Sequence, residues 1–274
     1  MRPVAALGAA TLILAPVVAL GAGCAPAERL SPSPIFIAAD EGYLAPDVLE
    51  RLAQSTPSAP LPGSSQDRAD RSASARFAAL EDSDRWLLAT AHAELRPPLA
   101  LQHFDCALGV RLGSAETPTL DRMLARAFHD AQAAAALVRE RGVRPRPAAD
   151  DPARRACQTL IPEARRSSAY PSGAATVGTA YAEALARIAP ERAEAVRRIG
   201  HEIGVSRLVC AMDYPSDVSA GEALGRAVMA EIAATPAFQV EVAAARDEIE
   251  AARATGRTNP GCAAERAALA VRLP

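Results

Sequence analysis

Three short segments of this sequence carry arginines, small residues and acids in an arrangement that could bind an oxyanion. They span residues 139–147, 170–174 and 206–217. A phosphate group needs guanidinium donors together with backbone N–H groups that point inward, and a helix that begins at a Ser-Gly pair supplies such N–H groups. We therefore expect the three segments to meet in one phosphate-binding site.

The order and internal spacing of these segments resemble the signature of the phosphatidic acid phosphatase type 2 and haloperoxidase superfamily, K-x6-R-P, P-S-G-H and S-R-x5-H-x3-D. The chain is more similar still to the class A bacterial non-specific acid phosphatases. The similar segments include Gly42-Tyr43-Leu44, Asp84-Arg85-Trp86, Phe104–Gly109, Tyr214–Val218 and Pro236-Ala237-Phe238. The resemblance runs from about residue 42 to 256, and it implies an all-α helical bundle and hydrolysis of phosphate monoesters.

The resemblance also implies roles for individual residues. The positions that bind phosphate in the family are occupied here by Arg139, Arg146, Ser172, Gly173 and Arg207. The family has a lysine at position 139, but all 30 basic residues of this chain are arginines, so Arg139 preserves the charge. Asp217 falls on the aspartate that orients the nucleophilic histidine.

Both catalytic histidine positions of the family hold other residues in this chain. Ala174 replaces the histidine that protonates the leaving oxygen, and Asp213 replaces the histidine that attacks phosphorus. Loss of a general acid costs roughly 10²–10⁴-fold in rate. Loss of the nucleophile removes the covalent route unless Asp213 takes its place, so Asp213 and Asp217 are the candidate catalytic residues.

Asp213 has two interpretations. It could accept a phosphoryl group with a magnesium ion between Asp213 and Asp217, although Pro215 lies between them and makes helical spacing uncertain. Alternatively, it forms ion pairs with Arg207 or Arg146 and fills the site itself. The second interpretation is favoured, and it predicts weak or lost activity toward ordinary phosphomonoesters.

Three functions follow from these residues. The protein is a slow phosphatase, a non-catalytic protein that binds phosphate or a small phosphorylated ligand, or a protein whose fold serves partner contacts. The retained Arg146, Ser172 and Arg207 argue against the third. No cofactor is expected, and the cysteines and histidines lack the spacing of a zinc site. His201 lies six residues before Arg207, but its place on a predicted scaffold helix favours a surface role.

The remaining sequence must supply the elements that position these residues, and its pattern predicts helices. Half of the residues are apolar and only 4% are aromatic, which favours alanine- and leucine-rich helices that pack closely. Apolar residues recur at three- and four-residue steps, with prolines at several helix starts. The predicted helices cover residues 73–95, 118–139, 173–188, 190–203, 216–233 and 236–254, with an irregular connection over 143–170.

The N-terminus predicts export. Residues 1–27 have Arg2, an apolar core and small residues, as in a signal peptide. Cleavage before Cys24 would produce a lipoprotein attached to a membrane, whereas cleavage after Ala22 or Ala27 would release a periplasmic or secreted protein. We expect an extended arm rich in Pro, Ser and Ala over residues 28–72, a helical domain over 73–256 and a tail over 257–274.

Cysteine content and charge agree with such a protein. Beyond Cys24 there are four cysteines, which in an oxidising compartment favour two disulfides with three possible pairings, the alternative being buried thiols. The formal charge of −2 gives no electrostatic reason to expect nucleic acid as a partner.

Overall fold

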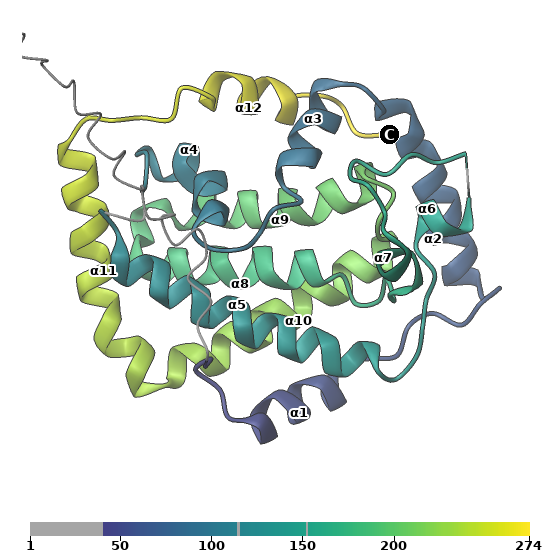
Figure 1. The fold of residues 1–274 in the computed structure, drawn as a ribbon, viewed down its shortest axis with the longest axis horizontal. Coiled ribbons are helices and arrows are strands. Elements are labelled where there is room, and N and C mark those ends of the chain that lie inside the picture. Colours follow the sequence, from purple (N-terminus) through teal and green to yellow (C-terminus); the bar gives the residue numbers. More distant parts are fainter. Residues whose placement is uncertain (1–40, 114–115, 152) are drawn as a thin grey trace, which may run out of the picture. The chain divides into compact units, whose positions relative to one another are not determined.

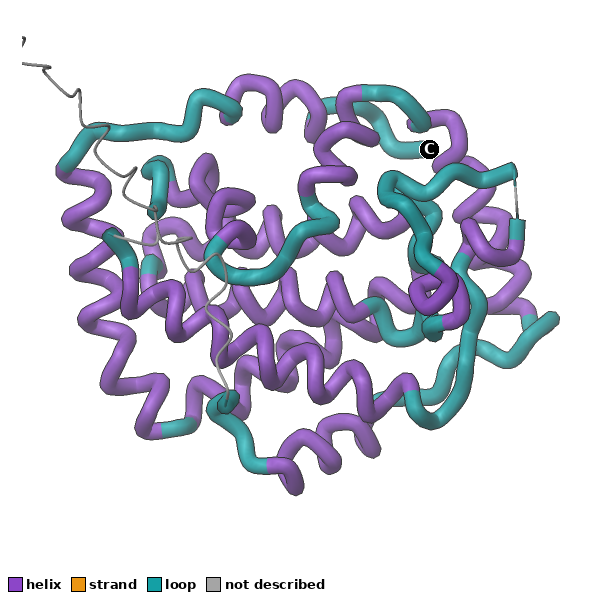
Figure 2. The backbone as a smooth tube through the Cα atoms, viewed as in Figure 1, coloured by secondary structure: helices purple, strands orange, loops and turns teal. Residues whose placement is uncertain are grey.

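The computed structural model describes residues 41–113, 116–151 and 153–274, which fold into helices joined by loops. Figure 2 shows no strand in this described part of the chain, and the all-α prediction is confirmed. The predicted signal segment 1–27 with Cys24, and the part of the predicted arm before residue 41, lie outside the described residues.

Four helices form the core: α5 (Pro118–Arg139), α8 (Gly173–Ile188), α9 (Ala193–Val209) and α10 (Pro215–Ala234). Helix α8 packs against the other three, as Figure 1 shows. Residues 175–182 of α8 are all buried, so this helix has no solvent-facing stripe near its middle. The start of α8 is enclosed as well, since Ser172, Ala175 and Thr176 are 0% exposed.

Helix α10 approaches the start of α8 at backbone distance. A Cβ atom on Gly221 would lie 2.4 Å from the carbonyl oxygen of Ser172, so only glycine fits between the two backbones. On the other side of this contact, the Ser172 N–H donates to the Asp217 carbonyl oxygen at 2.9 Å. The ends of α8 and α10 that carry the predicted site residues are thus fixed to each other.

Two further helices follow the core. Helix α11 (Pro236–Ala254) meets α10 at a bend of 93°. Within the described residues no single helix is long and apolar enough to cross a membrane, and α10 with α11 reaches that length and composition only as a bent pair. Helix α12 (Cys262–Leu269) corrects the predicted 257–274 tail, since a disulfide between Cys262 and Cys106 of α4 (Asp105–Leu108) attaches it to the domain.

The predicted extended arm over 28–72 is wrong in its described part. Residues 46–55 form α1 (Pro46–Ser55), and α2 (Ser65–Arg76) follows, capped by the Ser64 side chain, which accepts from the Asp67 N–H. Helix α2 buries polar residues, including Asp67 and Asp70, instead of an apolar stripe. Its sequence therefore lacks the periodic apolar pattern by which helices are predicted.

The predicted helix over 73–95 is interrupted. It consists of the end of α2, a 3-10 turn η1 (Phe77–Leu80) and α3 (Asp84–Ala91). Asp82 has a left-handed backbone with φ of 62°, and the Ser83 side chain caps α3, so the chain turns here. A second 3-10 segment, η2 (Leu99–Phe104), leads into α4.

The other predicted helices match the structure closely. The helix predicted over 190–203 is a 3-10 turn η3 (Pro190–Arg192) followed by α9, which continues to Val209. This extension places Ser206 and Arg207 on a helix. The connection over 143–170 is irregular apart from α6 (Pro147–Asp150) and α7 (Pro162–Arg166).

Candidate phosphate site

The three predicted segments meet around the side chain of Asp213, which follows α9. One carboxylate oxygen, Oδ1, accepts from Arg146 Nη1 at 2.7 Å. The other, Oδ2, accepts from the Ser172 hydroxyl at 2.7 Å and from Arg207 Nε at 3.3 Å. Asp213 is only 1% exposed. It thus forms ion pairs with both arginines that the sequence offered as alternative partners.

Arg146 donates most of its hydrogen bonds to backbone carbonyl and hydroxyl oxygens. Its Nε donates to the Ala164 carbonyl oxygen at 3.2 Å and its Nη2 to the Ser168 carbonyl oxygen at 3.1 Å. Its Nη1 donates to the Met212 carbonyl oxygen at 2.9 Å as well as to Asp213. Its Nη2 also donates to the Ser167 hydroxyl at 3.0 Å. These bonds use the five N–H groups of the guanidinium, one of them on Asp213 and the others on backbone and hydroxyl oxygens.

Arg139, at the end of α5, has much more free donor capacity. Its Nη2 donates to the Pro171 carbonyl oxygen at 3.2 Å, and its Nε is buried with no hydrogen-bond partner among the described residues. The guanidinium lies against Gly173, where a Cβ atom would be 2.1 Å from Nη2. Burial lowers the pKa of Arg139, although nearby Asp213 opposes this shift. Glycine at position 173 therefore makes room for an incompletely bonded cation.

A cavity of about 300 Å³ opens at this point. Its wall includes the three arginines and Asp213 of the site, with Gly173 and Ala174 from the start of α8. The rest of the lining comes mainly from Glu94, Arg96, Phe128, Gln132 and Gln158, none of which sequence reasoning selected. Because three guanidinium groups face a single carboxylate, these four side chains carry an excess of two positive charges. The cavity is suited to an anion.

The chain's histidines do not replace the two that the family uses. All four lie within the described residues, and none of them lines the cavity. His201 is on the surface with its Nδ1 2.7 Å from Glu222 Oε1, and this interaction raises its pKa. His92 is buried beside Ser206, with Nδ1 2.8 Å from the Ser206 hydroxyl oxygen. The expected surface role of His201 agrees with this geometry.

Asp217 does not act on Asp213 directly. Its carboxylate accepts from Arg144 Nη1 at 2.5 Å and from the Tyr214 N–H at 2.7 Å. Burial and the charge of Asp213 raise the pKa of Asp217 to about 7, while Arg144 opposes this shift. Asp213 pairs with Arg146 and Arg207, whereas Asp217 pairs with Arg144. The two carboxylates thus bind different cations and do not share one.

Arg144 is the main residue next to the site that sequence reasoning left without a role. It forms ion pairs with Asp67 at 3.1 Å, Asp70 at 2.8 Å and Asp217 at 2.5 Å. Its guanidinium carbon also lies 4.6 Å from the centre of the Tyr214 ring. Arg144 lies two residues before Arg146 in the first segment, but its acidic partners on α2 could not be inferred from that spacing.

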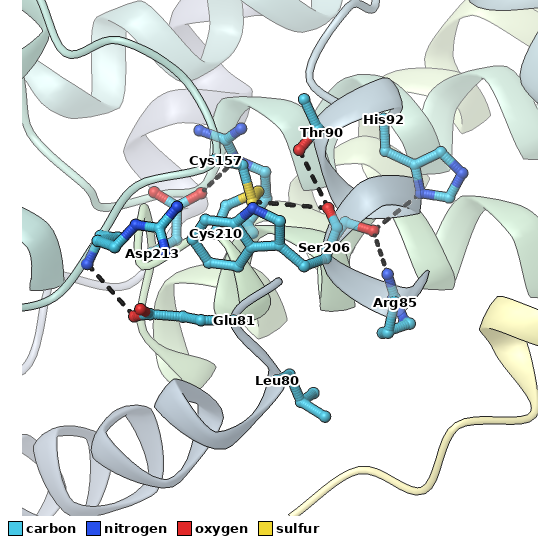
Figure 3. The surroundings of a disulfide bond; sticks show 12 residues. Leu80, Glu81, Arg85, Thr90, His92, Cys157, Ser206, Cys210 and Asp213 are labelled. Carbon is cyan, nitrogen blue, oxygen red and sulfur yellow. Dashed lines mark hydrogen bonds and ion pairs between the residues drawn. A yellow bond between two sulfur atoms is a disulfide. The ribbon is translucent and has the colours of Figure 1, made fainter. Parts of the chain in front are cut away.

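A disulfide supports one side of the site. Cys157, which precedes Gln158 of the cavity wall, is bonded to Cys210, three residues before Asp213 (Figure 3). On α9, the Ser206 hydroxyl accepts from Arg85 Nη1 at 2.9 Å and contacts His92 (Figure 3). These bonds hold the end of α9, and with it Arg207, in place. The disulfide prediction is confirmed, with pairings Cys106–Cys262 and Cys157–Cys210.

Comparison with known proteins identifies distant bacterial relatives, although no protein-family model matches the chain. An acid phosphatase of Zymomonas mobilis is 29% identical over 184 residues, which cover 65% of this chain and 68% of the relative. A non-specific acid phosphatase of Salmonella typhi is 29% identical over 66% of this chain and 73% of its own length. One from Providencia stuartii is 26% identical over 62% and 68%, respectively. These similarities support an acid phosphatase family for this chain.

Proposed function

We propose that this protein is an exported member of the acid phosphatase family that binds phosphate or a small phosphomonoester and hydrolyses phosphomonoesters weakly or not at all. The observation that carries the proposal is the hydrogen bonding of Asp213, which occupies the nucleophile position of the superfamily signature. Both of its carboxylate oxygens accept hydrogen bonds from residues that we expected to bind phosphate. Ala174 presents only a methyl group at the general acid position.

The bonding of Asp213 argues against a catalytic nucleophile. A nucleophile needs a lone pair directed at phosphorus, whereas Arg146, Ser172 and Arg207 all draw on the lone pairs of this carboxylate. Attack by a carboxylate on a phosphate also brings together two negative groups, a problem that enzymes of this kind solve with a divalent cation. Here the arginines stabilise Asp213 in its present position.

The same arrangement supports binding. The excess of two positive charges suits a phosphate group, which carries between one and two negative charges at mildly acidic to neutral pH. Arg139 keeps unused N–H groups at the cavity. The start of α8 adds backbone N–H groups and its helix dipole. We infer that Arg139 and Arg207, with the backbone at Gly173, are the principal contacts of the ligand.

Export is supported by the sequence of residues 1–27 and by the two disulfides, which form and persist mainly outside the cytosol. We propose a periplasmic or secreted location, with membrane attachment only if Cys24 is lipidated.

The activity is tested by p-nitrophenyl phosphate hydrolysis at mildly acidic to neutral pH, with and without magnesium. The double variant Ala174→His/Asp213→His restores both missing groups, and we expect its rate to exceed that of the wild type by at least about 100-fold. The single variant Ala174→His is the matched control, since it restores the acid without a nucleophile and should gain little. A wild-type rate comparable to that of the double variant would show that activity is retained.

A purely non-catalytic binding protein is the second candidate, and the ion pairs of Asp213 with Arg146 and Arg207 favour it. Calorimetric titration with inorganic phosphate tests it: binding without turnover of any phosphomonoester supports this candidate, and absence of binding rejects both.

A further inference from the structure

Among the three arginines of the Asp213 site, Arg139 and Arg207 keep unused hydrogen-bond donors. The Ser172 hydroxyl donates to Asp213, and the donors of Arg146 are engaged as described above. By contrast, within the described residues the terminal nitrogens of Arg207 make no hydrogen bond, and Arg139 donates only through Nη2. Both arginines line the cavity. An anion that enters would therefore be held by Arg139 and Arg207.

The same cavity presents a fixed acceptor. Asp213 is part of its wall, and its carboxylate is held by three donors from three different segments. Displacing the carboxylate would take a side chain that is 1% exposed out of its ion pairs with Arg146 and Arg207, which is costly. Its Oδ1 accepts only one hydrogen bond, from Arg146, and can accept another. The ligand must therefore bind beside Asp213, and one of its oxygens faces a carboxylate.

We infer that the cavity selects a phosphate group that carries a proton: Arg139 and Arg207 bind its charged oxygens, and its P–OH group donates to Asp213. This inference rests on the phosphate binding proposed above and adds to it the protonation state of the ligand and the residue that selects it. An oxyanion without a proton would place two negative oxygens against each other in a buried site. Sulfate is such an anion, with nearly the same size and shape.

Charge alone predicts the opposite preference. An excess of two positive charges attracts doubly charged sulfate more strongly than singly charged phosphate. A preference for phosphate therefore has to come from a hydrogen-bond acceptor that sulfate cannot satisfy. Sites built to receive a hydrogen bond reject analogues that lack the donor, because the buried acceptor is then left unpaired.

The test is calorimetric titration of the full chain with inorganic phosphate and with sulfate at about pH 6, where phosphate still carries a proton. We expect sulfate to bind at least about ten-fold more weakly than phosphate. In Asp213→Asn, which keeps the shape of the side chain and removes its charge, we expect the two affinities to come within about three-fold of each other. Arg139→Gln should weaken both anions about ten-fold or more.

Matched controls remove the same charges at exposed positions: Asp47→Asn on α1, whose side chain is 73% exposed, and Arg198→Gln on α9, at 62%. Neither should alter the ratio of the two affinities. Glycerol 2-phosphate, titrated in parallel, separates the two sources of a phosphate group: its binding supports a monoester, and binding of inorganic phosphate alone supports free phosphate.

Equal or tighter binding of sulfate by the wild type would overturn the inference while leaving phosphate binding intact. If Asp213→Asn still binds phosphate at least about ten-fold more tightly than sulfate, the inference would also be overturned, because another group would then be responsible. Failure of both anions to bind would reject the proposed function itself. If Asp213→Asn does not fold, the wild-type comparison and the Arg139→Gln variant still decide between these outcomes.

Discussion

Two neighbouring clusters of buried arginine and aspartate have opposite charge balance. In the Asp213 cluster, Arg139, Arg146 and Arg207 surround one carboxylate. In the Arg144 cluster, one guanidinium pairs with Asp67, Asp70 and Asp217. The clusters are adjacent, because Arg144 and Arg146 are two residues apart and the Ser172 N–H donates to the Asp217 carbonyl oxygen.

The excess negative charge of the Arg144 cluster is compensated by other groups of the protein. The Gly63 N–H donates to Asp67, the Tyr214 N–H to Asp217, and the Ser216 hydroxyl to Asp70. Arg71, on the same helix as Asp67, adds a second cation at 3.1 Å. Within the described residues the positive excess of the Asp213 cluster has no further carboxylate partner, and the cluster faces a cavity. The difference indicates that the Arg144 cluster stabilises the fold, and it supports the proposal that the Asp213 cluster binds an anion.

The largest expected effect is on stability, from Arg144→Met. This change leaves three buried carboxylates without their shared cation, and breaking a buried ion pair in this way costs about 3–5 kcal/mol. Urea unfolding followed by circular dichroism measures the loss, with Arg198→Met as the exposed control. A loss below about 1 kcal/mol would show that the Arg144 cluster does not stabilise the fold.

Asp217 links the clusters, and its pKa of about 7 gives a testable pH dependence. The folded state holds a proton on this group more tightly than the unfolded state, where the pKa is near 3.8. The resulting stabilisation is complete below about pH 4 and is lost as the pH rises through about 7. Asp217→Asn cannot ionise. Its stability relative to the wild type should therefore rise by roughly 4 kcal/mol as the pH increases from about 4 to about 7.

Unfolding free energies measured across this pH range provide the test. Because the charge of Asp213 contributes to the raised pKa, the same comparison made in an Asp213→Asn background should give a smaller gain. A difference between Asp217→Asn and the wild type that does not change with pH would contradict the shift.

Gly173→Ala tests the open side of the Asp213 cluster. The added Cβ atom would overlap Arg139 Nη2, so the guanidinium must move away from the cavity. We expect about ten-fold weaker phosphate binding, roughly 1.4 kcal/mol, with no loss of thermal stability. Gly142→Ala is the matched control, since its Cβ atom would meet nothing within 4 Å. Unchanged affinity in Gly173→Ala would remove Arg139 from the binding site.

The smallest effect is expected from Arg139→Gln on stability in the absence of phosphate. Arg139 is largely buried but forms no ion pair with a carboxylate in the described part of the chain. Its replacement by a neutral side chain should change the unfolding free energy by less than about 1 kcal/mol, and in the stabilising direction. A loss as large as that of Arg144→Met would remove the distinction between the two clusters.

The sequence was sufficient to predict the core helices and the residues that meet at Asp213. Helices α5, α8, α10 and α11 follow apolar periodicity, and three of them begin at a proline. Helix α2 was missed because Asp67 and Asp70 attach it to Arg144 by ion pairs. Ion pairs between distant segments do not produce the apolar periodicity by which helices are predicted. Helix α12, joined through Cys262 to Cys106, was missed for a related reason.

The roles of the acids also depend on three-dimensional contacts. Spacing placed Asp217 four residues after Asp213, but only the fold shows that it pairs with Arg144. The cavity wall includes Phe128, Gln132 and Gln158, which come from two distant segments, and no motif in the sequence marks these residues.

The close contact of Gly221 with the Ser172 carbonyl oxygen has a consequence for how the molecule melts. With no side chain between them, the start of α8 cannot separate from α10 without losing a backbone contact that runs through the core. We therefore expect the proposed binding site to lose its structure together with the helical core and not in a separate local transition. Phosphate binding should then raise a single melting temperature instead of ordering a loop.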